Sequence, residues 1–124
     1  MEQAVMELSQ RFFFSAAHTL EREIDAAGSA RPHGHTYHAE VTIAGKPGAT
    51  SGMVVDLGHV RKALGLLHDK LDHQFLNDVV GLGPATLENL CAYIARDIRE
   101  SSPGLVAVCV WREASGDRCT MRLA

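Results

Sequence analysis

Histidines are the residues of this chain whose type and spacing could most readily do chemistry. The 124-residue sequence has seven of them, and His18, His33, His35 and His38 all fall in its first third. If His33-Gly34-His35 is part of a strand, residues i and i+2 point to one face, so both imidazoles project together. Gly34 leaves the opposite face uncrowded, and His18 can supply a third nitrogen if its own strand pairs with this one. His38 is expected on the other face.

Three neutral imidazoles leave the charge of a divalent ion intact and one coordination position open, which is typical of catalytic zinc sites. Iron, copper and nickel also accept three imidazole ligands. The alternative interpretation is that these histidines only make hydrogen bonds at a strand end. We predict a metal site formed by His18, His33 and His35, with Zn²⁺ as the ion.

Two further places carry groups suited to acid–base or binding chemistry. Asp72-His73 follows the apolar pattern of a predicted helix, and a carboxylate beside an imidazole orients the ring and raises its basicity. Glu113 follows the apolar run that ends in Trp111, and there it could accept two hydrogen bonds from an amidine-like N–H pair of a ligand. Polar residues that only cap a helix or solvate a hairpin would give the same sequence pattern.

The elements that must position these residues follow from the hydrophobic pattern. Apolar residues alternate in two early segments and two late ones, which predicts strands, and recur at spacings of three and four in between, which predicts two helices. The predicted order is strand, strand, helix, helix, strand, strand over residues 6–18, 33–44, 57–71, 87–98, 105–111 and 118–123. Residues 19–32 are predicted to be a loop, and Asp56 is expected to cap the first helix.

This ββααββ order predicts an α+β fold, in which an antiparallel sheet is covered on one face by two helices. We expect a single domain over residues 1–124. The edge strands of so small a sheet favour pairing with other subunits. The phenylalanines at 12–14 and the cysteines Cys91, Cys109 and Cys119 are expected in the core.

Composition excludes several classes of function. The net charge is −3, which argues against a nucleic-acid partner. The longest apolar run, residues 105–111, is far short of the roughly 20 residues that span a bilayer, so no membrane role is expected. No secretory signal is visible at the N-terminus, and three widely spaced cysteines do not suggest a disulfide framework, so we expect a cytoplasmic protein.

Five segments, in order along the sequence, carry a resemblance to a known family: Phe14-Ser15-Ala16-Ala17-His18, His33-Gly34-His35-Thr36-Tyr37, Val55-Asp56-Leu57, Leu71-Asp72-His73 and residues 84–90. The sequence resembles the family of 6-pyruvoyl-tetrahydropterin and 6-carboxytetrahydropterin synthases. The late Glu113 continues the match, which covers nearly the whole chain. The resemblance implies the tunnelling fold, in which subunits join their sheets into a barrel. It also implies a homohexamer built from two trimers, with active sites at subunit interfaces.

The resemblance also implies roles for particular residues. His18, His33 and His35 match the zinc ligands, Asp72 and His73 the acid–base pair, and Glu113 the anchor for the pterin's guanidine-like edge. Family members act on 7,8-dihydroneopterin triphosphate. One branch eliminates triphosphate to give 6-pyruvoyltetrahydropterin, and a bacterial branch gives 6-carboxytetrahydropterin, a precursor of queuosine. The compact length is more similar to that of the bacterial branch.

One position departs from the family pattern. The family's catalytic cysteine lies four residues before the first histidine of the H-G-H motif, where this sequence has Ser29, and the glutamate of a related branch would fall on Ala30. A hydroxyl is a poor base unless it is strongly activated. Glu21, Glu23 and Asp25 lie in the same loop as possible substitutes. The sequence therefore predicts a zinc-dependent pterin lyase, with two alternatives: a homologue that binds zinc and pterin without turnover, or a lyase or aldolase that acts on another dihydropterin.

Overall fold

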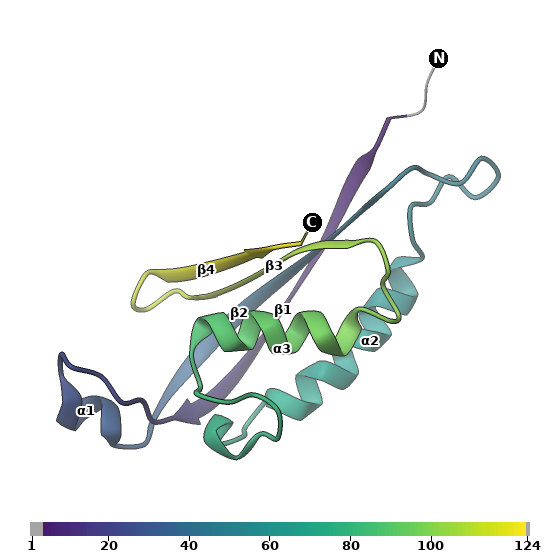
Figure 1. The fold of residues 1–124 in the computed structure, drawn as a ribbon. Coiled ribbons are helices and arrows are strands. Elements are labelled where there is room, and N and C mark those ends of the chain that lie inside the picture. Colours follow the sequence, from purple (N-terminus) through teal and green to yellow (C-terminus); the bar gives the residue numbers. More distant parts are fainter. Residues whose placement is uncertain (1–3, 124) are drawn as a thin grey trace.

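The computed structural model describes residues 4–123, and its elements follow the predicted order with two short additions (Figure 1). The strands are β1 (Met6–His18), β2 (His33–Gly45), β3 (Leu105–Arg112) and β4 (Asp117–Arg122). The helices are α1 (Ala26–Ala30), α2 (Leu57–Leu71), the 3-10 helix η1 (Leu76–Asp78) and α3 (Leu87–Ile98). The strands form one antiparallel sheet in the order β1-β2-β3-β4, so the predicted α+β architecture is confirmed.

The register of the first hairpin brings the histidines together. His18, the last residue of β1, lies opposite His33, the first residue of β2, and Ala16 lies opposite His35. Because side chains alternate along each strand, these three imidazoles share one face of the sheet. That face also carries Tyr37, which is buried.

The prediction of a loop over residues 19–32 is wrong in one respect, because this segment contains the short helix α1. A single turn is not stable alone, since helix nucleation is unfavourable. Here two backbone hydrogen bonds hold it: the Ser29 N–H donates to the carbonyl of Asp25 at 2.9 Å, and the Leu20 N–H donates to the carbonyl of Ser29 at 2.8 Å. The turn therefore places Ser29 against the end of the hairpin.

Helices α2 and α3 cover one face of the sheet, as Figure 1 shows, and their apolar stripes form the core with the even positions of β1 and the odd positions of β2. Asp56 caps α2 as predicted, because its carboxylate accepts a hydrogen bond from the Gly58 N–H at 2.8 Å. The Thr86 hydroxyl caps α3 in the same way, with Asn89 as donor. Among residues 4–123, no helix is long and apolar enough to cross a membrane.

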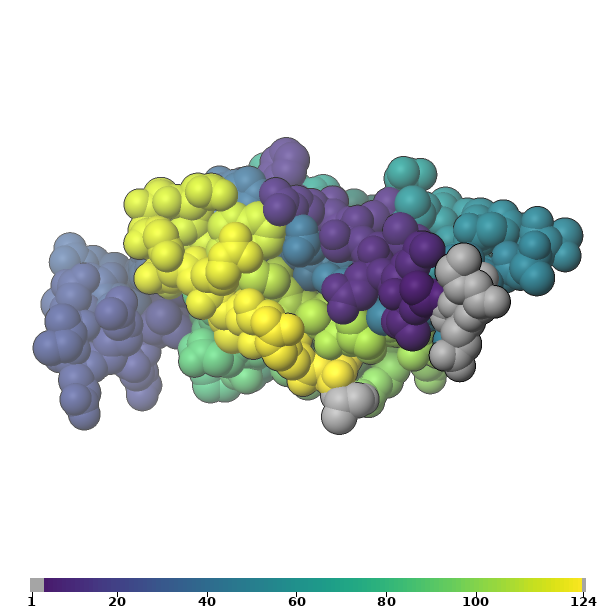
Figure 2. Space-filling view, turned by 90° about the horizontal axis from the view of Figure 1, so that it is seen from above, coloured from purple at the N-terminus to yellow at the C-terminus, as the bar shows by residue number. Residues whose placement is uncertain are grey.

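No helix among the described residues lies over the other face of the sheet. Figure 2 looks onto this face, with β4 in yellow on one side and β1 in purple on the other. Phe13 points to it and is 62% exposed, so the expectation that all three phenylalanines are core residues is wrong for Phe13, because side chains alternate along β1. Cys109 is buried on this face, where its sulfur accepts a hydrogen bond from Arg118.

Candidate metal centre and active site

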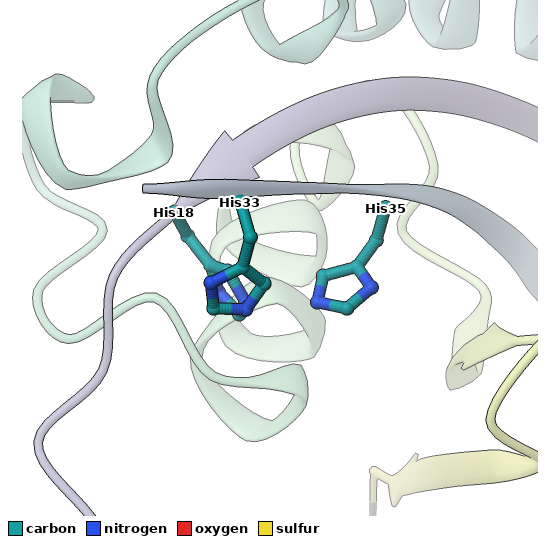
Figure 3. A group of neighbouring side chains, drawn as sticks. All are labelled: His18, His33 and His35. Carbon is teal, nitrogen blue, oxygen red and sulfur yellow. The ribbon is translucent and has the colours of Figure 1, made fainter. Parts of the chain in front are cut away.

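The three predicted metal ligands lie together at the end of the β1–β2 hairpin. One ring nitrogen from each of His18, His33 and His35 lies within 4.8 Å of the others. Figure 3 shows the three side chains hanging from the same side of the two strands, with the rings of His18 and His33 close together. The His18 side chain is buried, and the other two are partly exposed.

Backbone carbonyls fix the orientation of two of these rings. Nδ1 of His18 lies 2.8 Å from the carbonyl oxygen of Ala85, and Nδ1 of His33 lies 2.8 Å from that of Arg31. A carbonyl oxygen can only accept a hydrogen bond, so Nδ1 carries a proton in each ring, and in the neutral form of the ring Nε2 is the bare nitrogen. The two Nε2 atoms lie 2.9 Å apart.

In neutral rings two bare nitrogens at that distance face each other with their lone pairs, so the contact needs a positive charge between them, either a shared proton or a metal ion. The carbonyl partners of His18 and His33 are the kind of outer contact that orients histidine ligands of metals. The donor set of three imidazoles fits Zn²⁺. The residues therefore fit the predicted ion, and the hydrogen bonds of His18 and His33 are those that a metal site needs.

Arg112 of β3 is the charged group next to the triad. Its Nη1 lies 3.3 Å from Nε2 of His35, and its Nη2 donates to Oδ2 of Asp117 at 2.6 Å. Burial, followed by the positive charge of Arg112, lowers the pKa of His35 to about 4. Burial also lowers the pKa of His18 and raises the pKa of Tyr37 to about 12. The imidazoles of His18 and His35 are thus held neutral at pH 7, which is the form that binds a metal.

Ser29 is buried, and it borders the cavity of the triad. This cavity has a volume of about 320 Å³ and is lined by the three histidines and by Arg112, Asp117, Ser115, Arg22, Leu20, Asp25, Gly28 and Ser29. The residue at the predicted cysteine position therefore does lie beside the metal centre. Of the three acidic residues in the loop, Asp25 lines this cavity beside Ser29. Glu21 lines a neighbouring cavity that shares His18, Arg112 and Asp117 but not Ser29, and Glu23 lines neither.

Asp72 and His73 form a pair that the backbone of β1 holds in place. Nδ1 of His73 lies 2.6 Å from Oδ2 of Asp72, and the other carboxylate oxygen accepts the Ser15 N–H at 2.9 Å. The His73 N–H donates to the Ser15 carbonyl, and His73 has a left-handed backbone with φ of 58°. The hydrogen bonds from Ser15 and His73 lower the pKa of Asp72, which keeps this carboxylate ionised.

The Asp72–His73 pair and Glu113 do not line the triad cavity of the same subunit. His73 lines a separate open groove with Ser15 and Thr36, and His35 borders both hollows. Glu113 follows β3, and its Oε1 accepts the indole N–H of Trp111 at 2.8 Å, on the face without helices. A single subunit thus joins the metal ligands and Ser29 but separates them from the other predicted site residues.

The comparison with known proteins identifies the family. The family model of 6-pyruvoyl tetrahydropterin synthase matches residues 7–123. The chain belongs to this family.

Relatives and solved structures agree with this family assignment. The chain is 34% identical over 130 residues to the 6-carboxy-5,6,7,8-tetrahydropterin synthase of Bacillus subtilis, covering 94% of this chain and 84% of the relative. It is 34% identical over 105 residues to the Synechocystis enzyme of the same name, covering 80% of each. The solved 6-pyruvoyl tetrahydropterin synthase of Caenorhabditis elegans superposes with a TM-score of 0.83 at 26% identity, covering 100% of both proteins. The family's tunnelling fold is therefore confirmed for the subunit.

A more distant structure bears on the fold alone. The 6-pyruvoyltetrahydropterin synthase of Plasmodium vivax, solved with its catalytic glutamate replaced by alanine, superposes with a TM-score of 0.72 at 14% identity and covers 97% of this chain and 99% of its own.

Arg112 and Asp117 are residues of the cavity that sequence reasoning missed. A usable signal exists for Arg112, because it continues the even positions of β3, whose members Val108 and Val110 face the core. A charged residue at the next inward position indicates either a strand end or a site. In this family member it is both, since Arg112 ends β3 beside His35. Asp117 becomes recognisable only through its contact with Arg112.

Proposed function

We propose that this protein is a zinc-dependent lyase that converts 7,8-dihydroneopterin triphosphate to 6-carboxytetrahydropterin. The observation that carries the proposal is the pair of imidazole Nε2 atoms of His18 and His33, 2.9 Å apart with both Nδ1 atoms tied to carbonyls. Two 6-carboxytetrahydropterin synthases that match most of this chain at 34% identity support this product.

In this proposal His18, His33 and His35 hold the ion. Bound zinc would supply Lewis acidity toward the hydroxyl groups of the substrate. The protein's own groups then bind the pterin and move protons. Glu113 would accept the N–H pair of the pterin ring, and His73 would exchange a proton at Nε2 while Asp72 holds Nδ1.

The separation of these groups within one subunit supports assembly of the site from several subunits. Residues 73–75 run beside the end of β1, where Ala17 and Phe75 form a parallel bridge. Within residues 4–123, no other segment pairs with the outer edges of β1 and β4. We therefore propose that these edges join neighbouring sheets in a homohexamer, so that His73 and Glu113 serve sites on other subunits. We further propose a cytoplasmic location and a place in queuosine synthesis.

A second candidate follows from Ser29, which is buried at the position of the expected thiol. A protein without a proton acceptor there would bind zinc and pterin but turn nothing over. A third candidate, lyase or aldolase action on a dihydropterin without triphosphate, keeps the same site with another substrate.

A product assay separates these candidates. Zinc-loaded protein is incubated with 7,8-dihydroneopterin triphosphate, and separately with 7,8-dihydroneopterin, and the products are resolved by mass. Formation of 6-carboxytetrahydropterin with acetaldehyde establishes the proposed reaction. Zinc and pterin binding with no product from either substrate establishes the binding protein, and product from the dephosphorylated pterin alone establishes the third candidate.

A further inference from the structure

We propose that Asp25 takes the place of the missing thiol as the proton acceptor of this site. The inference rests on the proposed function, since it assumes a pterin substrate in which a carbon–hydrogen bond of the substituent on the ring must break. What the structure adds is a choice among the groups near Ser29, and that choice follows from the cavity lining and from the conformation of α1.

The carboxylate of Asp25 lies close to Ser29. Asp25 precedes α1 and lines the same cavity as Ser29 and the three histidines. Its side chain folds over α1 onto Gly28, where an added Cβ would lie 2.6 Å from Oδ1 and 2.7 Å from Oδ2 of Asp25. The absence of a side chain at Gly28 thus makes room for the carboxylate one residue from Ser29.

The side chain of Asp25 makes no capping hydrogen bond to α1. Asp25 is at the N-cap position of α1, where an aspartate side chain commonly accepts such a bond, so its carboxylate is free of that structural role. Its backbone lies in the left-handed region, with φ of 55°, a conformation that aspartate tolerates better than most residues. Backbone strain of this kind clusters at functional sites.

The other carboxylate of the cavity, that of Asp117, is held by hydrogen bonds. Asp117 accepts hydrogen bonds from Arg112 at 2.6 Å and from the Ser115 hydroxyl at 2.9 Å. These two partners lower the pKa of Asp117, which makes it a weaker base. Ser29 itself offers a hydroxyl, which is not a base unless a neighbour activates it. Glu21 lines the neighbouring cavity, which does not include Ser29, His33 or His35. Asp25 is the carboxylate of the triad cavity without a hydrogen-bonding partner for its side chain among the described residues.

The proposed step is a proton transfer. A carbon–hydrogen bond of the substituent on the pterin ring breaks, its proton moves to a carboxylate oxygen of Asp25, and its electron pair stays with the substrate carbon. The carboxylic acid so formed returns the proton to the substrate or to water. Because Asp25 is exposed, water can reach it.

The first test measures whether the carboxylate of Asp25 lies near residue 29, and it does not require turnover. In metal-free protein carrying Ser29→Cys, the alkylation rate of the introduced thiol is followed against pH by peptide mass spectrometry. Adding Asp25→Asn should lower the apparent pKa of that thiol by about half a unit or more, because a nearby carboxylate disfavours the thiolate. Adding Glu23→Gln, a matched change in the same loop, should leave it unchanged. An equal pKa in all three proteins would overturn the placement of Asp25.

The second test measures turnover, which depends on the proton transfer. Asp25→Asn should lower turnover of 7,8-dihydroneopterin triphosphate by about 100-fold or more, with zinc content and pterin affinity unchanged. Combining it with Ser29→Cys should restore turnover to within about tenfold, because a thiol then stands where the family has its own. Full activity of Asp25→Asn, or no rescue by the thiol, would overturn the proposal.

Failure of this inference and failure of the proposed function are distinguishable. If Ser29→Cys turns the substrate over and the natural protein does not, Asp25 is not the acceptor, and the pterin reaction stands as the ancestral function of the site. If neither protein binds the pterin, the proposed function is overturned instead.

Discussion

His33→Ala should change the stability of the metal-free and metal-loaded protein in different ways. Without metal, the substitution removes the hydrogen bond to the Arg31 carbonyl, worth about 1 kcal/mol. At pH 8, where neutral rings leave both Nε2 atoms bare, it also removes the 2.9 Å contact between the lone pairs of His18 and His33, which opposes folding. These effects oppose each other, so the free energy of unfolding at pH 8 should change by no more than about 1 kcal/mol.

With metal the same substitution should cost much more. A site with a hundredfold excess of zinc over its dissociation constant stabilises the folded state by about 2.7 kcal/mol. For a protein of this length that is a rise in Tm of about 10 °C. His33→Ala removes a ligand, so the rise should vanish.

Calorimetric melting with zinc and with a chelator, at one protein concentration, measures both quantities. His38→Ala is the matched control, because His38 lies on β2 but points to the helix-free face, where its ring stacks on Trp111. This control should keep the full zinc-dependent rise. The reasoning is refuted if His33→Ala also keeps that rise, or if the metal-free variant loses several kcal/mol, since His33 would then be a structural residue.

Three further predictions concern the rest of the site. Metal-free protein should lose about 2 kcal/mol of stability between pH 7 and pH 5 through His35 alone, because His35 has a pKa of about 4 in the folded state against 6.5 when unfolded, so the unfolded state takes up the proton first; urea unfolding at both pH values measures the loss, and His35→Gln should reduce it and leave the part that comes from His18, whose pKa is also lowered. Glu113→Gln should weaken pterin binding by about tenfold or more while zinc content stays constant, because one charge-assisted hydrogen bond is lost; a fluorescence titration that shows unchanged affinity would contradict the anchor role. Asp72→Asn should lower kcat by about 100-fold with little change in pterin affinity, because His73 loses the carboxylate that orients it; steady-state kinetics that show an effect on KM alone would argue for a binding role.

The architecture was predictable because it rests on local periodicity. The alternation of β1 and β2 and the three-and-four spacing of α2 and α3 are properties of short segments, and burial of their apolar faces admits few arrangements. The caps follow the same logic, as Asp56 shows. The helix α1 was not predictable, because one turn containing a glycine has no stable local signal and depends on the hydrogen bond between Leu20 and Ser29.

The sequence by itself determined which residues form the histidine triad, because the spacing of His33 and His35 and a hairpin register suffice to bring His18 beside them. Only the tertiary structure decided what surrounds the triad. Arg112 reaches His35 from a strand more than seventy residues away, and Asp25 rather than Glu21 or Glu23 borders the cavity through the path of α1. The Arg112 contact joins segments that are distant in the sequence, and the position of Asp25 depends on how the single turn α1 packs. Neither leaves a periodic trace in the sequence.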